Sequence, residues 1–400
     1  MSVPAGILGA VPQPPSPPAA GTGASTRVSS TPVPPHGRPP LHAVQVLGGG
    51  GAGSGAHVRS LAAGLVARGL KVTVCAPRGT GEGYGFAGAG AAFAPLGTGT
   101  DAQTVAGIRA ASSEADVVHA HGLRSAVLAA LALRGRRTPL VVTWHTKVRA
   151  AGARAQFVRL MERRAARAAA VVLGVTADLV DRARQRGARD ARLAPVAVPP
   201  PRPTPDDDEP RRHKARAELG AVARPLLVTV GRLDPDRGHG PLLDAARDWR
   251  ELDPEPLLIV AGEGRERPEL QRRIETEGLP VRLVGRRDDV PELLATADVA
   301  ILSSRWEARS VLAQEALHAG VPLVATAVGG VPDLVGDAAE LVPYGDAAAL
   351  SAAVTRLLGD PDRRAALVAA GFAQAATWPS EDDTVAHVLS VYDELAAGRG

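Results

Sequence analysis

A chain of 400 residues, 45% hydrophobic and 22% charged, can bury two cores, which excludes a single small module. Its 46 basic residues nearly balance 42 acidic ones, so the net charge of +4 indicates no nucleic-acid partner, and the one cysteine, Cys75, excludes an internal disulfide. No apolar run reaches the roughly 20 residues that a membrane span requires, and we expect a cytoplasmic protein.

The first 40 residues differ in composition from the rest of the chain. They hold 11 of the 34 prolines, together with Gly, Ala, Ser and Thr, and few large side chains. Burial of so few apolar groups does not offset the entropy of ordering, which predicts a disordered tail over 1–40. A start codon assigned too far upstream is the alternative.

From residue 41 onward, short β-branched runs alternate with helical stretches. The first strands are expected at His42–Leu47, Leu70–Cys75, Asp116–His121, Pro139–His145 and Ala170–Val175. After the proline-rich, acidic stretch Pro195–Pro210, further strands are expected at Pro225–Gly231, Pro256–Gly262, Val281–Gly285, Asp298–Ser303 and Pro322–Val328. Strands that alternate with helices predict parallel sheets with helices on both faces.

This pattern predicts an α/β fold of two Rossmann-like, doubly wound domains that face a central cleft. We place the N-terminal domain at 41–200, the linker at 201–212 and the C-terminal domain at 213–379. A last helix over 380–400 is expected to cross back to the N-terminal domain. In open parallel sheets, ligands bind beyond the carboxyl ends of the strands, so the residues after each strand are the candidates for a site.

A glycine-rich segment follows the first strand, and its backbone can approach a phosphate at the N-terminus of the next helix, which Ser54 can cap. The glycines concerned are Gly48, Gly49, Gly50 and Gly51. The segment also matches the G-x-G-x-x-G spacing of a dinucleotide fingerprint, ending at Gly53. No acidic residue for a cofactor ribose ends the second strand, although Arg78 suits a 2′-phosphate, so a dehydrogenase is a weaker alternative.

Three histidines lie at the ends of two further strands. Strand alternation places His119 and His121 on one side of their strand, and His145 ends a neighbouring strand. Three imidazoles can hold a metal ion, but no carboxylate or cysteine accompanies them, and we expect no metal site. Plain packing is one alternative; the interpretation that we favour is hydrogen bonding or acid–base catalysis by His145.

Two charged elements follow strands of the second half. Arg232 and Arg237 lie five residues apart in one loop, where two guanidinium groups can converge on a diphosphate; solvated surface is the alternative. Glu307 follows a strand, and Glu315 lies on the next helix, which opens near Ser310. A helical rise of about 1.5 Å per residue separates the two carboxylates by roughly 12 Å, a span that suits a sugar and a ribose.

These residues carry a resemblance to a known family. In the second half they are VTVGRL, VAGEG, LVGRRDDVPELLATADVAILSS, the Glu-x7-Glu element and AGVPLVATAVGGVPDLV. In the first half they are GGGGAGSGAHVRSLAAGLVARGLKVTVCAP, DVVHAHG and LVVTWHT. Together, over about 42 to 345, the chain resembles the retaining glycosyltransferases of family 4, of the group 1 type, which have the two-domain GT-B fold.

The resemblance implies a role for each matching residue. Gly48 to Gly51 would approach the donor phosphate and sugar, and His145 would contact the donor sugar or the acceptor. Arg232 and Arg237 would neutralise the leaving diphosphate, Glu307 would face the transferred sugar, and Glu315 the ribose. The other donor-binding residues would be Gly231, Gly285, Arg286, Ser310 and Val311.

The chain departs from the family pattern near the sugar. The basic residue before Gly238 is usually lysine and is Arg237 here. The first glutamate is commonly followed by Gly-Phe-Gly or Pro-Phe-Gly, where this chain has Ala308-Arg309-Ser310. The identity of the donor sugar therefore cannot be transferred from the family to this chain. A non-catalytic sugar-nucleotide-binding protein and a GT-B epimerase stay open as alternatives.

The residues predict electrostatic catalysis without a metal ion, because two arginines and a helix N-terminus can stabilise a departing nucleotide diphosphate. No carboxylate is evidently placed as a nucleophile, so, as in the family, we expect a hexose-type transfer with retention of configuration. We expect no cofactor, since the nucleotide diphosphate sugar is a substrate. The acidic run Asp206–Glu209 is expected to be a solvated part of the linker.

The acceptor has no motif of its own, and a sugar, an inositol phosphate or a lipid-linked sugar are all candidates. A basic stretch from Arg149 to Arg167 is interleaved with Phe157, Leu160 and Met161. A solvated helix explains it, and peripheral contact with the inner face of a membrane is the alternative.

Overall fold

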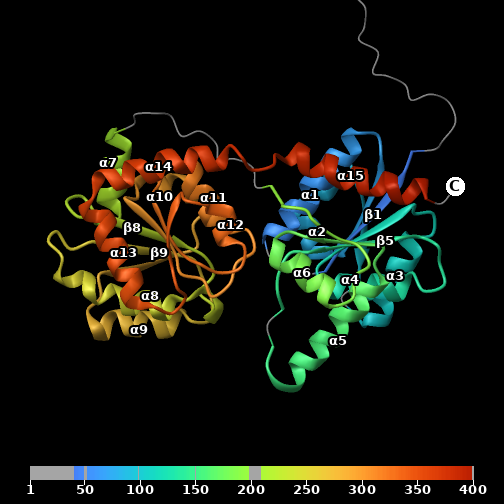
Figure 1. Ribbon diagram of the computed structural model, residues 1–400, viewed down its shortest axis with the longest axis horizontal. Coiled ribbons are helices and arrows are strands. Elements are labelled where there is room, and N and C mark those ends of the chain that lie inside the picture. The colour runs from blue at the N-terminus through green and yellow to red at the C-terminus, as the bar shows by residue number, and fades with distance from the viewer. Residues whose placement is uncertain (1–39, 49–51, 98, 149, 198–208, 399–400) are drawn as a thin grey trace, which may run out of the picture. The chain divides into compact units, whose positions relative to one another are not determined.

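The computed structural model describes residues 40–48, 52–97, 99–148, 150–197 and 209–398 (Figure 1). Apart from Pro40, the tail expected over 1–40 lies outside the described residues, as does most of the expected linker. The helix α7 begins at Glu209, inside the stretch expected as linker. Pro210 lies in its first turn, where the missing proline N–H would have no helical partner anyway.

The N-terminal half holds a seven-stranded sheet in the order β3-β2-β1-β4-β5-β6-β7, and all of its strand pairs are parallel. Its strands are β1 His42–Leu47, β2 Lys71–Pro77, β3 Ala92–Leu96, β4 Val117–His121, β5 Leu140–Trp144, β6 Val171–Gly174 and β7 Ala191–Leu193. Its helices are α1 Ala52–Ala67, α2 Arg78–Tyr84, α3 Asp101–Ala111, α4 Leu123–Ala132, α5 Gly152–Ala168 and α6 Ala177–Gln185, with a short 3-10 helix, η1, at Phe86–Ala89.

The C-terminal half holds a six-stranded parallel sheet in the order β10-β9-β8-β11-β12-β13. Its strands are β8 Leu226–Val230, β9 Leu257–Ala261, β10 Val281–Gly285, β11 Val299–Leu302, β12 Leu323–Thr326 and β13 Ala339–Val342. The helices are α7 Glu209–Glu218, α8 His239–Ala246, α9 Arg267–Glu277, α10 Val290–Thr296, α11 Val311–His318, α12 Val331–Val335, α13 Ala347–Gly359 and α14 Pro361–Ala375, and α15 Glu381–Ala397 follows them along the chain. The 3-10 helices η2 and η3 span Pro235–Arg237 and Asp248–Glu251.

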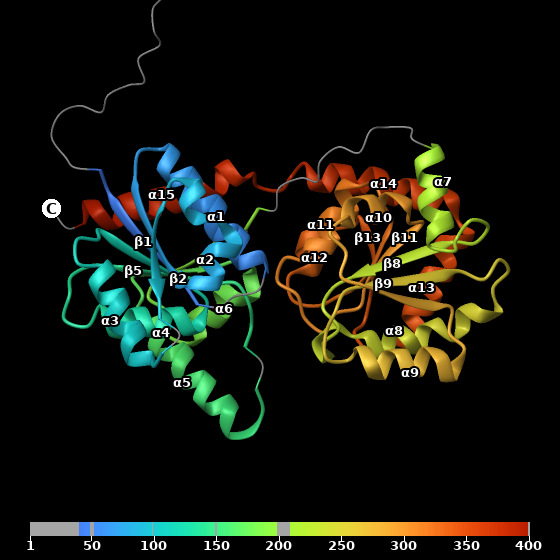
Figure 2. The same ribbon diagram turned by 180° about the vertical axis from the view of Figure 1, so that it is seen from behind.

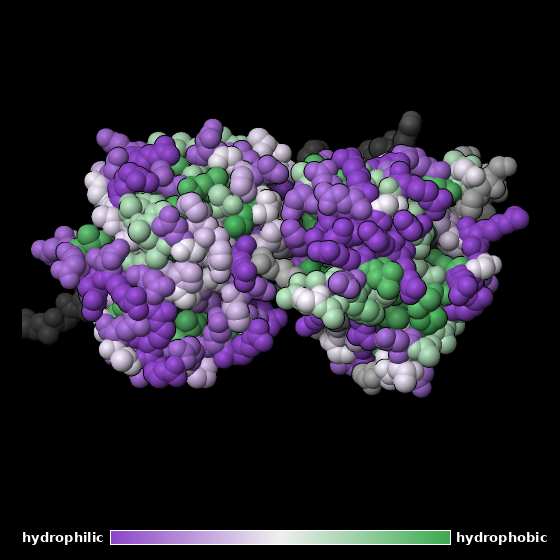
Figure 3. Space-filling model, turned by 60° about the horizontal axis from the view of Figure 1, so that its bottom comes forward, coloured by the Kyte–Doolittle hydropathy of each residue, from purple (hydrophilic) through white to green (hydrophobic). Residues whose placement is uncertain are grey.

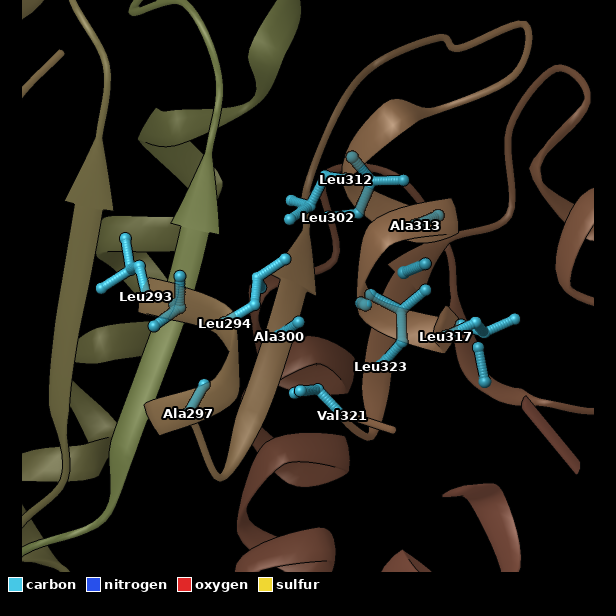
Figure 4. Packing of buried hydrophobic residues seen from close by; sticks show 14 of the residues in the cluster. Leu293, Leu294, Ala297, Ala300, Leu302, Leu312, Ala313, Leu317, Val321 and Leu323 are labelled. Carbon is cyan, nitrogen blue, oxygen red and sulfur yellow. The ribbon is translucent and has the colours of Figure 1, made fainter. Parts of the chain in front are cut away.

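Helices cover both faces of each sheet, which confirms the expected fold class of two Rossmann-like, parallel-sheet domains. In the C-terminal half, α10, α11 and α12 pack on one face, and α8, α9 and α13 on the other. Leu294, Leu302 and Leu317 are among the buried side chains of the first of these layers (Figure 4). In the N-terminal half, α3, α4 and α5 cover one face. The other face packs against α1 and α15.

The helix α15 follows the last element of the C-terminal half, yet it packs on the N-terminal half beside α1 (Figures 1 and 2). Val385 contacts α1 at Gly64, where a Cβ atom would lie 2.5 Å from a Val385 methyl group. Glycine at this position therefore lets the two helices approach closely. The same packing carries Tyr392, which is fully buried, to the sheet.

Candidate active site

A chain of buried polar groups crosses the face of the N-terminal sheet that α1 and α15 cover. Gln45 on β1 is paired in register with His119 on β4, and His121 is paired with Thr143 on β5. Paired residues of parallel strands project to the same side, so the four side chains share one face. Each of the four is at most 4% exposed. Tyr392 from α15 completes the group.

The hydrogen bonds of this polar chain run in one direction. The Gln45 amide nitrogen donates to the Tyr392 hydroxyl at 2.7 Å, so the hydroxyl proton is directed to His119 Nδ1, also at 2.7 Å. A neutral His119 then carries its proton on Nε2 and donates it to Thr143 Oγ1 at 2.6 Å. At the other end, the Gln45 oxygen accepts from His121 Nε2 at 2.8 Å. The proton on Nε2 leaves His121 Nδ1 with a lone pair.

That lone pair points toward His145, which lies at one end of the polar chain. His121 Nδ1 lies 3.1 Å from His145 Nε2, and His145, just after β5, is partly exposed. His57 on α1 joins them, with ring centroids 5.6 Å from His121 and 5.4 Å from His145. Burial lowers the pKa of His57 to about 4 and of His119 to about 3, and it holds the pKa of His121 and of His145 well below 6.5. The four imidazoles are therefore neutral at pH 7.

The structure thus brings His145 together with His121, as strand alternation suggests, but adds three partners that sequence reasoning missed. These are Gln45, His57 and Tyr392. A glutamine inside an otherwise apolar strand was a usable signal for Gln45. No local pattern connects α1 or α15 with the ends of β4 and β5.

The glycine-rich segment is only partly described. The Gly48 backbone N–H donates to Ser125 Oγ at 2.8 Å, so this amide is already bound within the protein. Gly49, Gly50 and Gly51 lie outside the described residues, and their expected contact with a donor phosphate stays a prediction.

A second cluster lies beyond the ends of β8 and β11. The Arg237 guanidinium pairs with the Glu307 carboxylate, which also accepts from Ser304 Oγ at 2.8 Å. Gly238 follows Arg237 with a φ of +70°, and a Cβ there would lie 1.9 Å from the Ser303 carbonyl oxygen. Only glycine permits this approach of the two loops. Arg237, which is predicted to bind the diphosphate, and Glu307, which is predicted to bind the sugar, are therefore in direct contact.

Arg232 and Arg237 have different partners, although they share a loop. Arg232 pairs with Asp234 at 2.7 Å, and its side chain is 73% exposed. The Gly231 backbone N–H is bound to the Ala261 carbonyl oxygen at 2.9 Å. Arg232 therefore has to leave Asp234, or share it, before it contacts a diphosphate beside Arg237.

The helix α11 begins next to this cluster. Ser310 caps it, because its hydroxyl accepts from the Ala313 N–H at 3.2 Å, and the Val311 side chain is 41% exposed. Within the described residues, the Glu315 carboxylate on α11 has no hydrogen-bond or ion-pair partner. Burial raises its pKa, because a carboxylate removed from water binds its proton more tightly.

The remaining predicted donor residues lie after β10, and the departure from the family pattern lies just before α11. Gly285 has a φ of +74°, and Arg286 is exposed and pairs with Asp288 at 3.3 Å. The Arg309 guanidinium lies 6.0 Å from the centre of the Trp378 ring. Burial lowers the Arg309 pKa to about 10, and its Nη2 atom has no hydrogen-bond partner among the described residues.

No helix among the described residues is long and apolar enough to cross a membrane.

Family profiles match both halves of the chain. The profile described as glycosyl transferases group 1 matches residues 211–374, and that of the glycosyl transferase 4-like domain matches residues 52–199. The D-inositol 3-phosphate glycosyltransferase of Salinispora arenicola is 32% identical over 332 residues, which cover 73% of this chain and 72% of that relative.

Two further proteins are similar over different extents. The alpha-D-kanosaminyltransferase of Streptomyces kanamyceticus is 32% identical over 217 residues, which span 51% of this chain and only 55% of that relative. The crystal structure of the Anabaena protein HepE in complex with UDP superposes with a TM-score of 0.75 at 20% identity. It covers 88% of this chain and all of HepE, which shows a common fold. The two sheets, the motifs at their carboxyl ends and these matches show that the chain belongs to the group 1 glycosyltransferases of the GT-B fold.

Proposed function

We propose that the protein moves a hexose-type sugar from a nucleotide diphosphate sugar to a hydroxyl acceptor with retention of anomeric configuration. The observation that carries this proposal is the cluster of Arg237, Glu307 and Ser304 beside the capped N-terminus of α11. It offers a cation and backbone N–H groups for a leaving diphosphate, and a carboxylate for sugar hydroxyls.

Leaving-group stabilisation drives the proposed transfer. As the bond from the anomeric carbon to the diphosphate breaks, its electron pair stays on the phosphate oxygen, where Arg237, Arg232 and the α11 N-terminus lower the energy of the charge. The acceptor oxygen attacks the same face, and its proton passes to the departing phosphate. The two substrates supply every atom that is transferred, and in this proposal Arg237, Arg232 and the α11 N-terminus stabilise the charge without a cofactor or a metal ion.

The remaining residues hold the substrates. Glu307 would accept hydrogen bonds from the transferred sugar, and Glu315 from the ribose hydroxyls. His145 would contact the sugar or the acceptor from the N-terminal domain, with the orientation of its ring fixed by His121. The backbone near Gly285 and Arg286 would line the pocket for the base.

The relatives suggest which substrates to test first. HepE has been solved with UDP and with UDP-glucose, so UDP-sugars are the first donors to offer. One relative is named for D-inositol 3-phosphate, and another, from Mycolicibacterium smegmatis, for a phosphatidylinositol mannoside. An inositol phosphate and a lipid-linked inositol sugar are therefore the first acceptors.

The test is a panel of nucleotide sugars, with hydrolysis and transfer followed by chromatography and the configuration of the product read by NMR. We expect one donor to be turned over, with the anomeric configuration kept and with activity unchanged by EDTA. Inversion of configuration would refute the mechanism. A donor that binds in calorimetry without turnover would favour the alternative of a non-catalytic binder.

We also propose peripheral membrane contact through α5. Phe157 and Leu160 on this helix are 61% and 45% exposed, beside the exposed Arg159 and Arg163; Arg149 lies outside the described residues. Figure 3 shows the face at the bottom of Figure 1, where hydrophobic and hydrophilic side chains adjoin over the N-terminal half. Flotation with anionic and neutral vesicles tests the contact. Phe157→Ser should abolish binding to anionic vesicles, and equal binding by the variant would refute it.

A further inference from the structure

We propose that His57, His121 and His145 form a binding site for a divalent transition-metal ion, with zinc as the preferred ion. Each histidine offers one ring nitrogen, and the three nitrogens lie within 4.8 Å of one another. His121 Nδ1 and His145 Nε2 are already 3.1 Å apart. Tetrahedral zinc with Zn–N bonds of about 2.0–2.1 Å needs nitrogens about 3.3 Å apart, so a small closing movement of the rings completes the site.

The cluster differs from the set that the sequence suggests. Alternation along β4 groups His119 with His121, but both ring nitrogens of His119 are engaged, one by Tyr392 and one by Thr143. His57 takes its place from α1. The metal site is therefore assembled from a helix, a strand and the loop after the next strand.

The tautomer of His121 favours a metal. Its Nε2–H donates to the Gln45 oxygen, which leaves the Nδ1 lone pair directed at the other two imidazoles. A hydrogen bond from the far ring nitrogen to an oxygen is the usual outer contact of a metal-bound histidine. Gln45 is itself held by Tyr392, so the ligand is oriented before the ion arrives.

The ligand set indicates both the kind of ion and an open coordination position. Neutral imidazoles suit zinc, copper, nickel and iron, and three histidines with a free fourth position form a known class of zinc site. The partial exposure of His145 leaves that side accessible. The three ligands are neutral, so the bound ion keeps its full charge and attracts water, hydroxide or an anionic oxygen to the fourth position.

Metal binding has a consequence that rests on the proposed function. The nitrogen of His145 that faces His121 is the one that a zinc ion would occupy. Zinc on that nitrogen would replace the contact with His121 that fixes the orientation of the His145 ring, so zinc should lower the rate of transfer. Binding itself can be measured without any substrate.

The test titrates metal-free full-length protein with zinc against a chromophoric chelator. We expect one ion per chain for the unaltered protein. His57→Asn, which removes a ligand outside the proposed transfer machinery, should weaken binding by at least 100-fold. The matched control is His213→Asn, which removes an exposed histidine of α7 and should leave the affinity unchanged. Cobalt bound to the unaltered protein should show the intense visible absorption of a tetrahedral nitrogen site.

The outcomes distinguish the buried histidine site from zinc bound elsewhere on the protein. Equal zinc affinity in His57→Asn and the unaltered protein, or loss of binding in His213→Asn, would overturn the proposal in favour of a surface site. A six-coordinate cobalt spectrum would overturn it without any variant. One tightly bound zinc in a protein that transfers no sugar would support the metal site and refute only the proposed function. Sugar transfer by a protein that binds no zinc would refute the metal site and support the proposed function.

Discussion

Replacement of Tyr392 by phenylalanine should destabilise the N-terminal half and disturb the candidate site from a distance. The hydroxyl is fully buried and lies between the Gln45 amide nitrogen and His119 Nδ1, 2.7 Å from each. Tyr392→Phe keeps the ring and its packing but removes both hydrogen bonds. It leaves one donor and one acceptor buried without a partner.

The expected cost follows from those two orphaned groups. A buried polar group that loses its hydrogen bond costs about 1–3 kcal/mol, so the substitution should lower the free energy of unfolding by about 2–6 kcal/mol. The His119 and Gln45 side chains can then reorient, and Gln45 also sets the tautomer of His121. We therefore expect a lower transfer rate for each folded molecule as well as a lower denaturation midpoint.

Urea denaturation followed by circular dichroism measures the stability, and Tyr344→Phe supplies the matched control. Tyr344 is partly exposed, lies under Arg305, and has no hydrogen bond to its hydroxyl among the described residues, so its loss should cost almost nothing. If the two variants had equal midpoints, the two hydrogen bonds of the Tyr392 hydroxyl would not stabilise the fold. A destabilised Tyr392→Phe with full activity per folded molecule would confine the polar chain to a structural role.

Four other substitutions test the site. Burial raises the Glu315 pKa, so the folded carboxyl binds protons more tightly than the unfolded one, and stability falls as pH rises through that pKa. Glu315→Gln should therefore raise the melting temperature at pH 7 while it weakens nucleotide binding in calorimetry; unchanged binding would remove Glu315 from the site. Arg237→Ala should lower kcat more than affinity, and its effect should be non-additive with that of Arg232→Ala if both contact one diphosphate; additive changes in KM alone would contradict this. His145→Ala should cost about 100-fold or more in transfer with nucleotide diphosphate affinity intact, whereas a lower melting temperature with normal activity would indicate packing.

The central strands of both sheets could be predicted from sequence because they are buried on both faces and read as continuous apolar runs. The strand at His42–Leu47 is found at those residues. Three strands were missed: β3, β7 and β13, at sheet edges. The strand β3 contains Pro95 and has only Leu96 buried, and β7 has three residues. Edge strands need less apolar surface and tolerate proline, so their sequences carry a weaker signal.

The candidate site could be predicted only where its residues follow strands. The rule that ligands bind beyond the carboxyl ends of parallel strands selected His145, Arg237 and Glu307, and two of these are in direct contact. It could not select His57, which comes from a helix, or Tyr392, which is almost 350 residues from Gln45 along the chain. Such contacts depend on how helices pack on the sheet, and a single sequence does not encode them as a local pattern.

The polar chain beneath α15 occupies a place where the fold alone would favour apolar residues. Gln45, His119 and Thr143 replace what would be valines or leucines on that face, and each fully buried polar group must find a partner or lower stability. All the partners are present except at one end, where His121 and the partly exposed His145 face each other across 3.1 Å. Stability alone does not explain why the network ends at the carboxyl edge of the sheet, which is where ligands bind in parallel sheets. Its position argues that α15, the last helix of the chain, holds the histidines of the first domain in the orientation that their chemistry requires.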